Sequence, residues 1–207
     1  MEQLLQELRE KGITDERVMA AMSAVDRRDF VSSSFRDCAY RDMPISIGCG
    51  QTISQPTIVG LMTQLLDVRS NHRVFEVGTG SGFQTVILSQ LARHVYTTER
   101  VRSLFARARE LITSKYHRQN ISFLFRDGAL GLAEAAPFDR IIITAASTEV
   151  PRELLAQLKD GGIMVLPVAT TEWEQRLVTV RKSSNELEYK EICSVRFVPL
   201  VEGIRDV

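Results

Sequence analysis

A run of closely spaced glycines is the first feature of this chain that could do chemistry. The segment EVGTGSGFQT (76–85) places Gly78, Gly80 and Gly82 directly after the apolar stretch RVFEV (73–77). Such a turn lets the backbone approach a ligand closely, with the N–H groups of the following helix directed at it. The spacing is GxGxG, so the last position of the dinucleotide fingerprint GxGxxG/A is not matched. The segment indicates either a nucleoside site or a tight turn without function.

Polar residues at the ends of the next three predicted strands strengthen the ligand-site interpretation. The strands and the residues that end or follow them are HVYTTE (94–99) with Glu99, ISFLF (121–125) with Asp127 and Gly128, and FDRIIIT (138–144) with Thr144. Open α/β sheets bind ligands at the carboxyl ends of their strands, where these residues would gather. An acid about 20 residues after the glycine turn can bind the hydroxyls of a ribose. Each residue alone could start a helix or form an ordinary turn, but together they favour a nucleoside site.

The loop GCGQTISQP (48–56) is a second candidate region. It precedes a segment whose apolar residues recur with helical spacing, and Pro56 suits the first turn of that helix. We expect Ser54 or Gln55 to cap the helix, whose start carries free N–H groups and partial positive charge. The pattern alone fits a surface connector as well as a substrate contact.

An alternation of strands and helices must position these residues. Apolar, β-branched strands alternate with amphipathic segments over residues 56–168, which indicates a parallel sheet covered on both faces. We predict an α/β fold with a doubly wound, mostly parallel sheet, preceded by N-terminal helices. Residues 26–53 show no regular pattern, and we expect irregular structure there. The stretches RLVTV (176–180) and ICSVRFVPL (192–200) predict antiparallel strands at one edge, where Pro199 is tolerated.

The length favours one domain, residues 1–207. Within it we expect N-terminal helices with a substrate loop (1–55), a nucleoside-binding α/β core (56–168) and C-terminal edge strands (169–207).

Composition argues against several other classes of protein. The 26 Lys and Arg residues balance the 26 Asp and Glu residues, which disfavours a dominant nucleic-acid surface. No apolar run approaches the roughly 18 residues of a membrane span, and the first residues do not form a signal peptide. The three cysteines show no CxxC spacing, so free thiols in a reducing cytoplasm are the simplest interpretation. The three histidines lack metal-ligand spacing, and we expect no metal site.

Several longer motifs follow one another along the chain. In order, they are RRDFV (27–31), AYRD (39–42), IGCGQTISQP (47–56), VFEVGTGSGFQT (74–85), APFDRIIITAA (136–146), LLAQLKDGGIMVLPV (154–168) and VRFVPLVEG (195–203). Together they are similar to one family, the protein-L-isoaspartate O-methyltransferases in their bacterial form. The resemblance runs from about residue 4 to residue 204. Only the glycine motif is shared with other Rossmann-like methyltransferases that use S-adenosylmethionine, whereas the loop at 47–56 and VRFVPL are more specific.

This resemblance implies a reaction, a cofactor and partners. Family members move a methyl group from S-adenosylmethionine to the α-carboxylate of isoaspartyl residues in aged proteins, which leaves S-adenosylhomocysteine. The implied partners are isoaspartyl peptides and proteins. We expect a monomer in the cytoplasm, without nucleic-acid or membrane partners.

The resemblance also implies two groups of site residues. Donor binding is implied for Thr52, Ile53, Ser54, Glu76, Gly78, Thr79, Gly80, Ser81, Gly82, Glu99, Asp127, Gly128 and Thr144. Binding of the isoaspartyl group is implied for Thr52, Gln55, Val198, Leu200 and Val201. Within the first group, Glu99 would bind the ribose hydroxyls and Asp127 the adenine amino group, and Ser54 of the TIS motif is the implied catalytic position.

The lack of an obvious catalytic base is consistent with this reaction. A carboxylic acid is already ionised at pH 7, so no proton has to be removed from the acceptor. Two alternatives remain: a methyltransferase of the same fold that acts on another carboxylate, and a protein that binds S-adenosylmethionine without transferring its methyl group. Cys49 and Arg126 bear on the second alternative, because the family usually has other residues at these positions.

Overall fold

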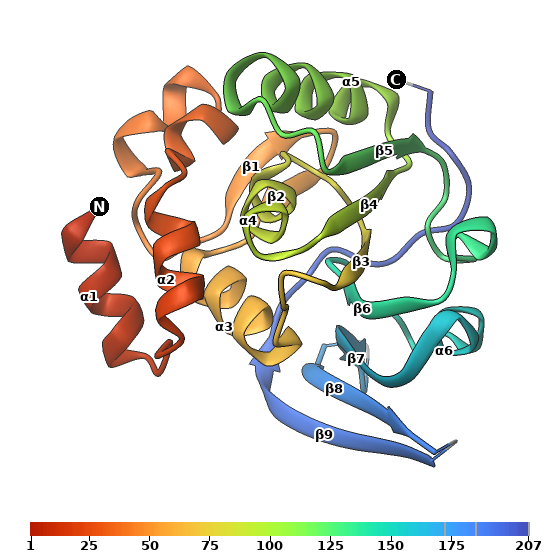
Figure 1. Ribbon diagram of the computed structural model, residues 1–207. Helices are drawn as coiled ribbons and strands as arrows, with labels where there is room; N and C mark the ends of the chain where they lie inside the picture. The colour runs from red at the N-terminus through yellow and green to blue at the C-terminus, as the bar shows by residue number, and fades with distance from the viewer. Residues whose placement is uncertain (172, 185, 207) are drawn as a thin grey trace.

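In the part of the chain that the structure describes, residues 1–171, 173–184 and 186–206, a seven-stranded sheet forms the centre of the molecule (Figure 1). This computed structural model has the strand order β5-β4-β3-β6-β7-β8-β9. The strands are β3 (Arg73–Val77), β4 (His94–Glu99), β5 (Ile121–Phe125), β6 (Phe138–Ile143), β7 (Leu158–Ala169), β8 (Gln175–Ser183) and β9 (Glu186–Val195). Pairing is parallel from β5 across to β7 and antiparallel for β8 and β9. The predicted fold class is confirmed.

Helices cover both faces of this sheet. They are α3 (Pro56–Leu66), α4 (Phe83–Leu91), α5 (Arg102–Leu111) and α6 (Arg152–Gln157), with short helical turns at Ile112–Tyr116 and Ala133–Ala135. Val74 of β3 packs in a core cluster with Leu88 of α4, whereas the next residue, Phe75, packs in another with Leu154 of α6. Because successive side chains of a strand point to opposite faces, a strand buried on both faces is apolar throughout. None of the described helices is long and apolar enough to cross a membrane.

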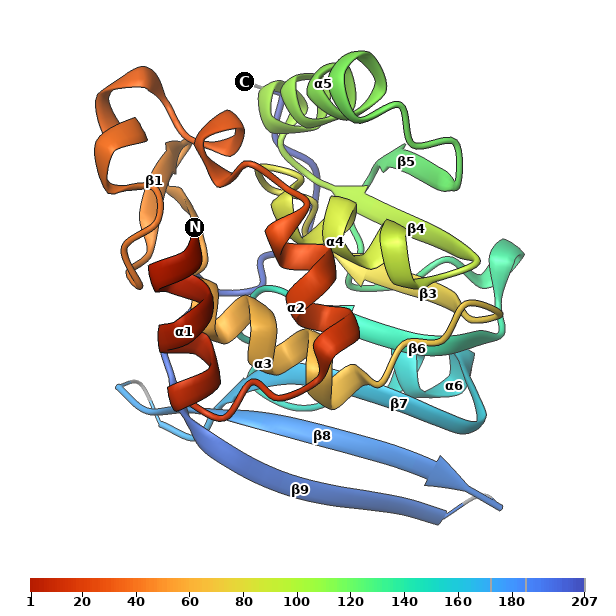
Figure 2. The ribbon, with the colours of Figure 1, turned by 60° about the vertical axis from the view of Figure 1, so that its left-hand side comes forward.

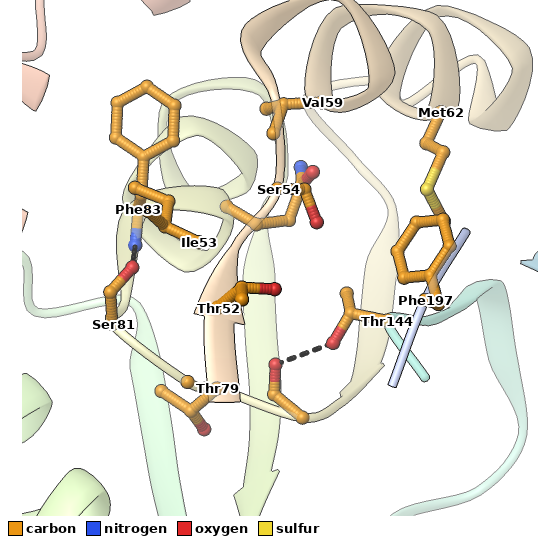
Figure 3. A pocket seen from close by; sticks show the side chains of 13 residues that line it. Thr52, Ile53, Ser54, Val59, Met62, Thr79, Ser81, Phe83, Thr144 and Phe197 are labelled. Atoms are coloured by element: carbon orange, nitrogen blue, oxygen red, sulfur yellow. Dashed lines mark hydrogen bonds between the residues drawn. The ribbon is translucent and has the colours of Figure 1, made fainter. Parts of the chain in front are cut away.

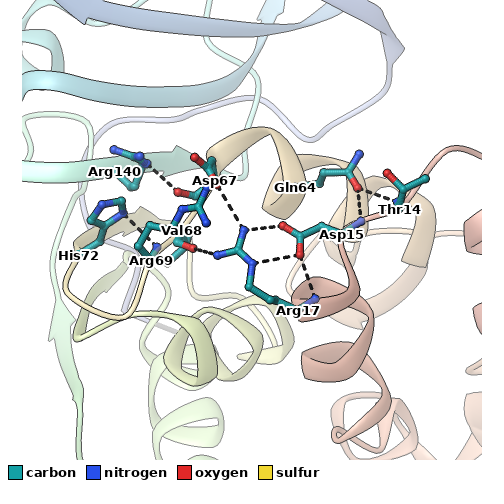
Figure 4. A network of polar contacts seen from close by, with 9 residues as sticks. All are labelled: Thr14, Asp15, Arg17, Gln64, Asp67, Val68, Arg69, His72 and Arg140. Atoms are coloured by element: carbon teal, nitrogen blue, oxygen red, sulfur yellow. Dashed lines mark hydrogen bonds and ion pairs between the residues drawn. The ribbon is translucent and has the colours of Figure 1, made fainter.

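The helices α1 (Glu2–Glu10) and α2 (Glu16–Ser23) form an outer layer over α3 and α4 (Figure 2). A polar network ties α2 to the end of α3 (Figure 4). Arg17 donates to the carbonyl of Val68 at 2.8 Å and pairs with Asp15 at 2.6 Å. The Gln64 side chain accepts hydrogen bonds from the backbone N–H groups of Thr14 and Asp15, at 2.8 and 2.9 Å. The N-terminal helices are therefore fixed against the core.

Residues 26–53 contain more regular structure than the sequence indicated. Two 3-10 helices (Arg27–Phe30 and Ser33–Cys38) lead into a small hairpin of β1 (Ile45–Gly48) and β2 (Gln51–Ile53). The turn between these strands includes Cys49 at a φ of 55°. Elements of three to six residues are too short to show a periodic pattern, and so the expectation of irregular structure was wrong.

The last strand ends earlier than predicted. β9 stops at Val195, and the following residues run back toward the start of α5 (Figure 1). The Val198 carbonyl accepts from the N–H of Ala146 at 2.8 Å, and the Leu200 N–H donates to the Ala146 carbonyl at 2.7 Å. Farther on, the Arg205 N–H donates to the carbonyl of Arg100 at 2.7 Å. The C-terminal segment therefore passes over the carboxyl ends of the parallel strands.

Candidate active site

Two cavities open near the carboxyl edge of the parallel strands. The first, which we call the strand-end cavity, has a volume of about 330 Å³ and is lined by Gly78, Glu99 and Asp127 among others. The second, the loop cavity, has a volume of about 310 Å³, and its lining includes Ser54 and Phe197. Each is large enough to hold most of a small ligand.

The two cavities meet at one point. Thr52, Thr144 and Val198 line both of them. A smaller hollow of about 50 Å³ lies beside this junction, and Figure 3 shows the Thr52 and Ser54 side chains among those that line it. Ligands in the two cavities would therefore approach one another beside Thr52 and Thr144.

Glycine is required in the turn that borders the strand-end cavity. Gly78 has a φ of +96°, and a Cβ at this position would collide with the hydroxyl of Thr144. That hydroxyl donates to the Gly78 carbonyl at 2.9 Å, which holds the end of β6 against the turn. Gly82, which precedes α4, has a φ of +91°, and a Cβ there would collide with Ile112. Both positions therefore require glycine for packing, and Gly78 and Gly80 leave backbone without side chains at the edge of the strand-end cavity.

Glu99 is held in place at the end of β4 and is only 5% exposed. Its carboxylate accepts hydrogen bonds from the N–H groups of Gly80, at 2.8 Å, and Val101, at 2.9 Å. A carboxylate offers about four acceptor sites, so capacity remains for a ligand in the cavity. Glu99 therefore supports the glycine turn and can still bind hydroxyl groups.

Asp127 lies where the C-terminal segment crosses the end of β5. Its carboxylate accepts from the N–H of Ala129 at 2.9 Å and from the N–H of Gly203 at 2.6 Å. A Cβ at the neighbouring Gly128 would collide with the hydroxyl of Thr98. Arg126, which also lines the cavity, forms an ion pair with Glu134 at 2.7 Å. The Arg126 guanidinium is thus held by Glu134, and Asp127 keeps acceptor capacity of its own.

Glu76 lies behind the glycine turn and is fully buried. Its Oε2 accepts from the hydroxyls of Thr85, at 2.5 Å, and Thr97, at 2.7 Å, whereas its Oε1 has no partner among the described residues. Burial raises the pKa of Glu76 to about 7. The Thr97 hydroxyl lies 2.6 Å from that of Thr79, so this network supports the turn from beneath.

Ser54 lines the loop cavity and the small hollow beside the junction, but not the strand-end cavity, and capping of α3 does not engage its side chain. Gln55 occupies the capping position, but its side chain makes no capping hydrogen bond. The cap comes instead from Asp42, which accepts from the N–H of Thr57 at 2.8 Å and from the Thr57 hydroxyl at 2.7 Å. The expected capping by a Ser54 or Gln55 side chain was therefore wrong. Within the described residues the Ser54 hydroxyl has no hydrogen-bond partner, which leaves it available to a ligand.

The other residues expected in the site lie around these cavities. Ile53, Thr79 and Ser81 line the small hollow, Gly80 lines the hollow and the strand-end cavity, Gln55 lines the loop cavity, and Leu200 and Val201 line the strand-end cavity. Sequence reasoning missed Arg100 and Arg205, which also line the strand-end cavity. The position of Arg100 directly after Glu99 was an available signal, whereas no local pattern marks Arg205. No group of three possible metal ligands occurs among the residues described.

Comparison with known proteins agrees with this geometry. The family model for protein-L-isoaspartate(D-aspartate) O-methyltransferase matches residues 1–205. The chain is similar to the protein-L-isoaspartate O-methyltransferase of Ruegeria pomeroyi, with 54% identity over 98% of this chain and 94% of the relative. The relative from Cereibacter sphaeroides is also 54% identical, over 95% of this chain and 90% of its own.

Solved structures show the same fold. A Plasmodium falciparum structure, described as a protein-L-isoaspartate O-methyltransferase in complex with S-adenosyl-L-homocysteine, aligns with a TM-score of 0.85 at 26% identity. The alignment covers 96% of this chain and 97% of that one. Together with the strand-end and loop cavities, these matches identify the chain as a member of the protein-L-isoaspartate(D-aspartate) O-methyltransferase family.

Proposed function

We propose that this chain transfers the methyl group of S-adenosylmethionine to the α-carboxylate of L-isoaspartyl residues in peptides and damaged proteins. The observation that carries the proposal is the junction of two cavities at Thr52 and Thr144, in a chain of this family. The strand-end cavity suits the donor and the loop cavity suits the acceptor. Their reacting groups would meet at a point lined by neutral hydroxyls.

The strand-end cavity has the features that a nucleoside donor needs. Glu99 retains acceptor capacity for the ribose hydroxyls, and Asp127 is available to the adenine amino group. The turn from Gly78 to Gly82 leaves bare backbone for the methionine moiety. Bound there, S-adenosylmethionine supplies an activated methyl group.

The loop cavity supplies neutral hydrogen-bond donors in place of a base. A carboxyl group with a pKa of about 3.5–4 is already ionised near pH 7, so no proton has to be removed. The carboxylate loses its charge as it accepts the methyl group, so a strong ion pair would stabilise the starting state more than the transition state. The hydroxyls of Ser54 and Thr52 can orient a carboxylate oxygen without that penalty. Alignment and exclusion of water then remain as the main contributions.

The acceptor is expected to be a flexible segment that can bend into the loop cavity. Pairing of the substrate peptide, as an added β-strand, with residues 197–200 is disfavoured, because much of the backbone there already makes hydrogen bonds within the protein. The Phe197 N–H and carbonyl bond the Gln175 side chain, and Val198 and Leu200 bond Ala146. We further propose a cytoplasmic monomer without nucleic-acid partners, which the three unpaired cysteines and the balanced charge support.

A matched pair of peptides tests the function. The protein is incubated with radiolabelled S-adenosylmethionine and one peptide sequence that contains either isoaspartate or ordinary aspartate. Turnover on the isoaspartyl peptide alone is the expected result. Turnover on both peptides, or on a small carboxylic acid instead, would favour the alternative methyltransferase. Binding of the donor without any turnover would favour a protein that only binds it.

A further inference from the structure

Arg27 is a cation buried in the N-terminal region. Arg27 is 1% exposed, and its Nη1 has no hydrogen-bond partner among the described residues. Burial lowers the pKa of Arg27 to about 10, so the side chain remains charged at neutral pH. The neighbouring Arg28 is by contrast exposed and pairs with Asp26 at 2.7 Å. Because a buried charge without an ion pair destabilises the folded state, the contacts that Arg27 makes need an explanation.

The Arg27 guanidinium contacts both sides of the active site. Its Nη2 donates to the carbonyl of Ser54 at 2.7 Å, and its Nε donates to the carbonyl of Ala39 at 2.8 Å. Its Cζ lies 5.0 Å from the ring centroid of Phe83, the first residue of α4 after the glycine turn. One side chain therefore connects the loop that carries Ser54 to the helix whose first residue, Phe83, lines the small hollow beside the junction.

This contact fixes a whole peptide unit. The peptide bond between Ser54 and Gln55 is planar, so the Gln55 N–H points away from the carbonyl that Arg27 holds. A charged donor on that carbonyl polarises the peptide unit and makes its N–H a stronger donor. Gln55 lines the loop cavity, and its N–H has no backbone partner among the described residues. Through the Ser54 carbonyl, Arg27 thus fixes the orientation of the peptide unit that joins Ser54 to Gln55.

We propose that Arg27 is a positioning residue for methyl transfer, which sets the Ser54–Gln55 peptide unit relative to Phe83 and the start of α4. It acts through Ser54 and touches neither substrate. The catalytic consequence rests on the proposed function, whereas the structural part, a loop held by Arg27, stands independently of it.

Three variants test the role of Arg27. Arg27→Met removes the charge and the hydrogen bonds, Arg27→Lys keeps the charge but loses the planar fork, and Arg28→Met is the matched exposed control. We expect Arg27→Met to lower kcat/KM on the isoaspartyl peptide by at least about 30-fold, with Arg27→Lys intermediate. The affinity for S-adenosylhomocysteine should stay within about twofold of the parent, and Arg28→Met should match the parent throughout.

A purely structural role would give a different pattern. It would weaken S-adenosylhomocysteine binding and activity in parallel, or lower thermal stability without changing kcat per folded molecule. Either result, or parental kcat and KM in Arg27→Met, would overturn the proposal. If Arg27→Met does not fold, Arg27→Lys is judged by the same criteria.

A second measurement separates this proposal from the proposed function. If the parent and Arg28→Met both fail to methylate the peptide, the proposed function is wrong, and amide hydrogen exchange of residues 51–58 decides the role of Arg27. With S-adenosylhomocysteine present, we expect that segment to exchange at least about fivefold faster in Arg27→Lys than in Arg28→Met. Equal exchange would contradict the proposal.

Discussion

The strand-end cavity and the loop cavity are built in different ways. Around the first, Glu99 and Thr144 lie at strand ends and hydrogen-bond the glycine turn directly. The segment that borders the second, residues 45–57, is held by side chains from outside it. Arg27 holds the Ser54 carbonyl, Asp42 caps Thr57, and Arg107 donates to the carbonyl of Ile47 at 2.6 Å.

This difference implies that the two binding functions can be separated. Donor binding depends on the backbone shape of the glycine turn, which the sheet fixes. Acceptor recognition depends on a loop whose position is set by a few charged side chains. Apart from Thr52, Thr144 and Val198, which line both cavities, substitutions on one side should therefore leave the other side measurable.

Gly78→Ala should have the largest effect, on donor binding. A Cβ would collide with Thr144 at a backbone conformation that L-residues disfavour, so the turn must move. We expect affinity for S-adenosylhomocysteine to fall by at least about 100-fold, or about 2.7 kcal/mol, in calorimetry. Gly161→Ala is the control, because Gly161 also has a positive φ but no atom within 4 Å of the added Cβ. A Gly78→Ala variant that binds S-adenosylhomocysteine as tightly as the parent would refute the dependence of donor binding on the glycine turn.

Ser54→Ala should produce the next largest effect, and only on the acceptor side. The hydroxyl caps nothing, so we expect turnover of isoaspartyl peptide to fall about 30-fold, or about 2 kcal/mol, with unchanged S-adenosylhomocysteine binding. Stability should change by no more than about 0.5 kcal/mol. Ser34→Ala, at an exposed serine, is the control. Parental turnover in Ser54→Ala would remove Ser54 from the mechanism.

Glu76, beneath the glycine turn, should make the stability of the protein depend on pH near neutrality. Its folded pKa of about 7 exceeds the ordinary 4.5, so between these values the folded protein holds a proton that the unfolded chain has lost. Stability should therefore fall as pH rises through this window, and Glu76→Gln should abolish the fall. From pH 5 to pH 8, measured by urea unfolding, the free energy of unfolding of Glu76→Gln should rise by at least about 1 kcal/mol relative to that of the parent. A constant difference between the two proteins would contradict this.

Asp42, which caps α3 beside the loop cavity, should make the stability of the protein depend on pH in acid, with a smaller effect. Hydrogen bonds from Lys11 and Thr57 hold the pKa of Asp42 below its ordinary 3.8, despite the opposing effect of burial. The contribution of Asp42 to folding stability is therefore present above pH 3.8 and is lost as the pH falls through the lower pKa of the folded state. Asp42→Asn should cost about 1 kcal/mol at pH 7, and less at pH 3, by thermal unfolding. The exposed Asp37→Asn should show no such loss, and equal losses in both variants would rule out the cap.

The sequence predicted the strand-end cavity better than the loop cavity, for a physical reason. Gly78, Glu99 and Thr144 follow strands whose apolar runs are visible locally, and parallel strands bring their carboxyl ends together. The contacts of Arg27 with Ser54 and of Asp42 with Thr57 join residues 27 and 15 positions apart. No periodic pattern records such contacts, so the loop's supports could not be predicted.

The C-terminal segment shows the same limit. VRFVPL was expected to continue a strand, because its composition is that of an edge strand. The structure instead directs Val198 and Leu200 to Ala146 and carries Gly203 to Asp127. These pairings depend on where β6 and β5 end in space, which the local sequence does not specify.

A crystal structure with S-adenosylhomocysteine and an isoaspartyl peptide would show whether donor and acceptor meet at the junction of the two cavities. We expect the nucleoside in the strand-end cavity beside Glu99, and the peptide carboxylate in the loop cavity within hydrogen-bond distance of the Ser54 hydroxyl. The sulfur and that carboxylate should then face one another at Thr52 and Thr144. A peptide carboxylate bound away from Ser54, or a nucleoside outside the strand-end cavity, would contradict the assignment of donor and acceptor to these two cavities.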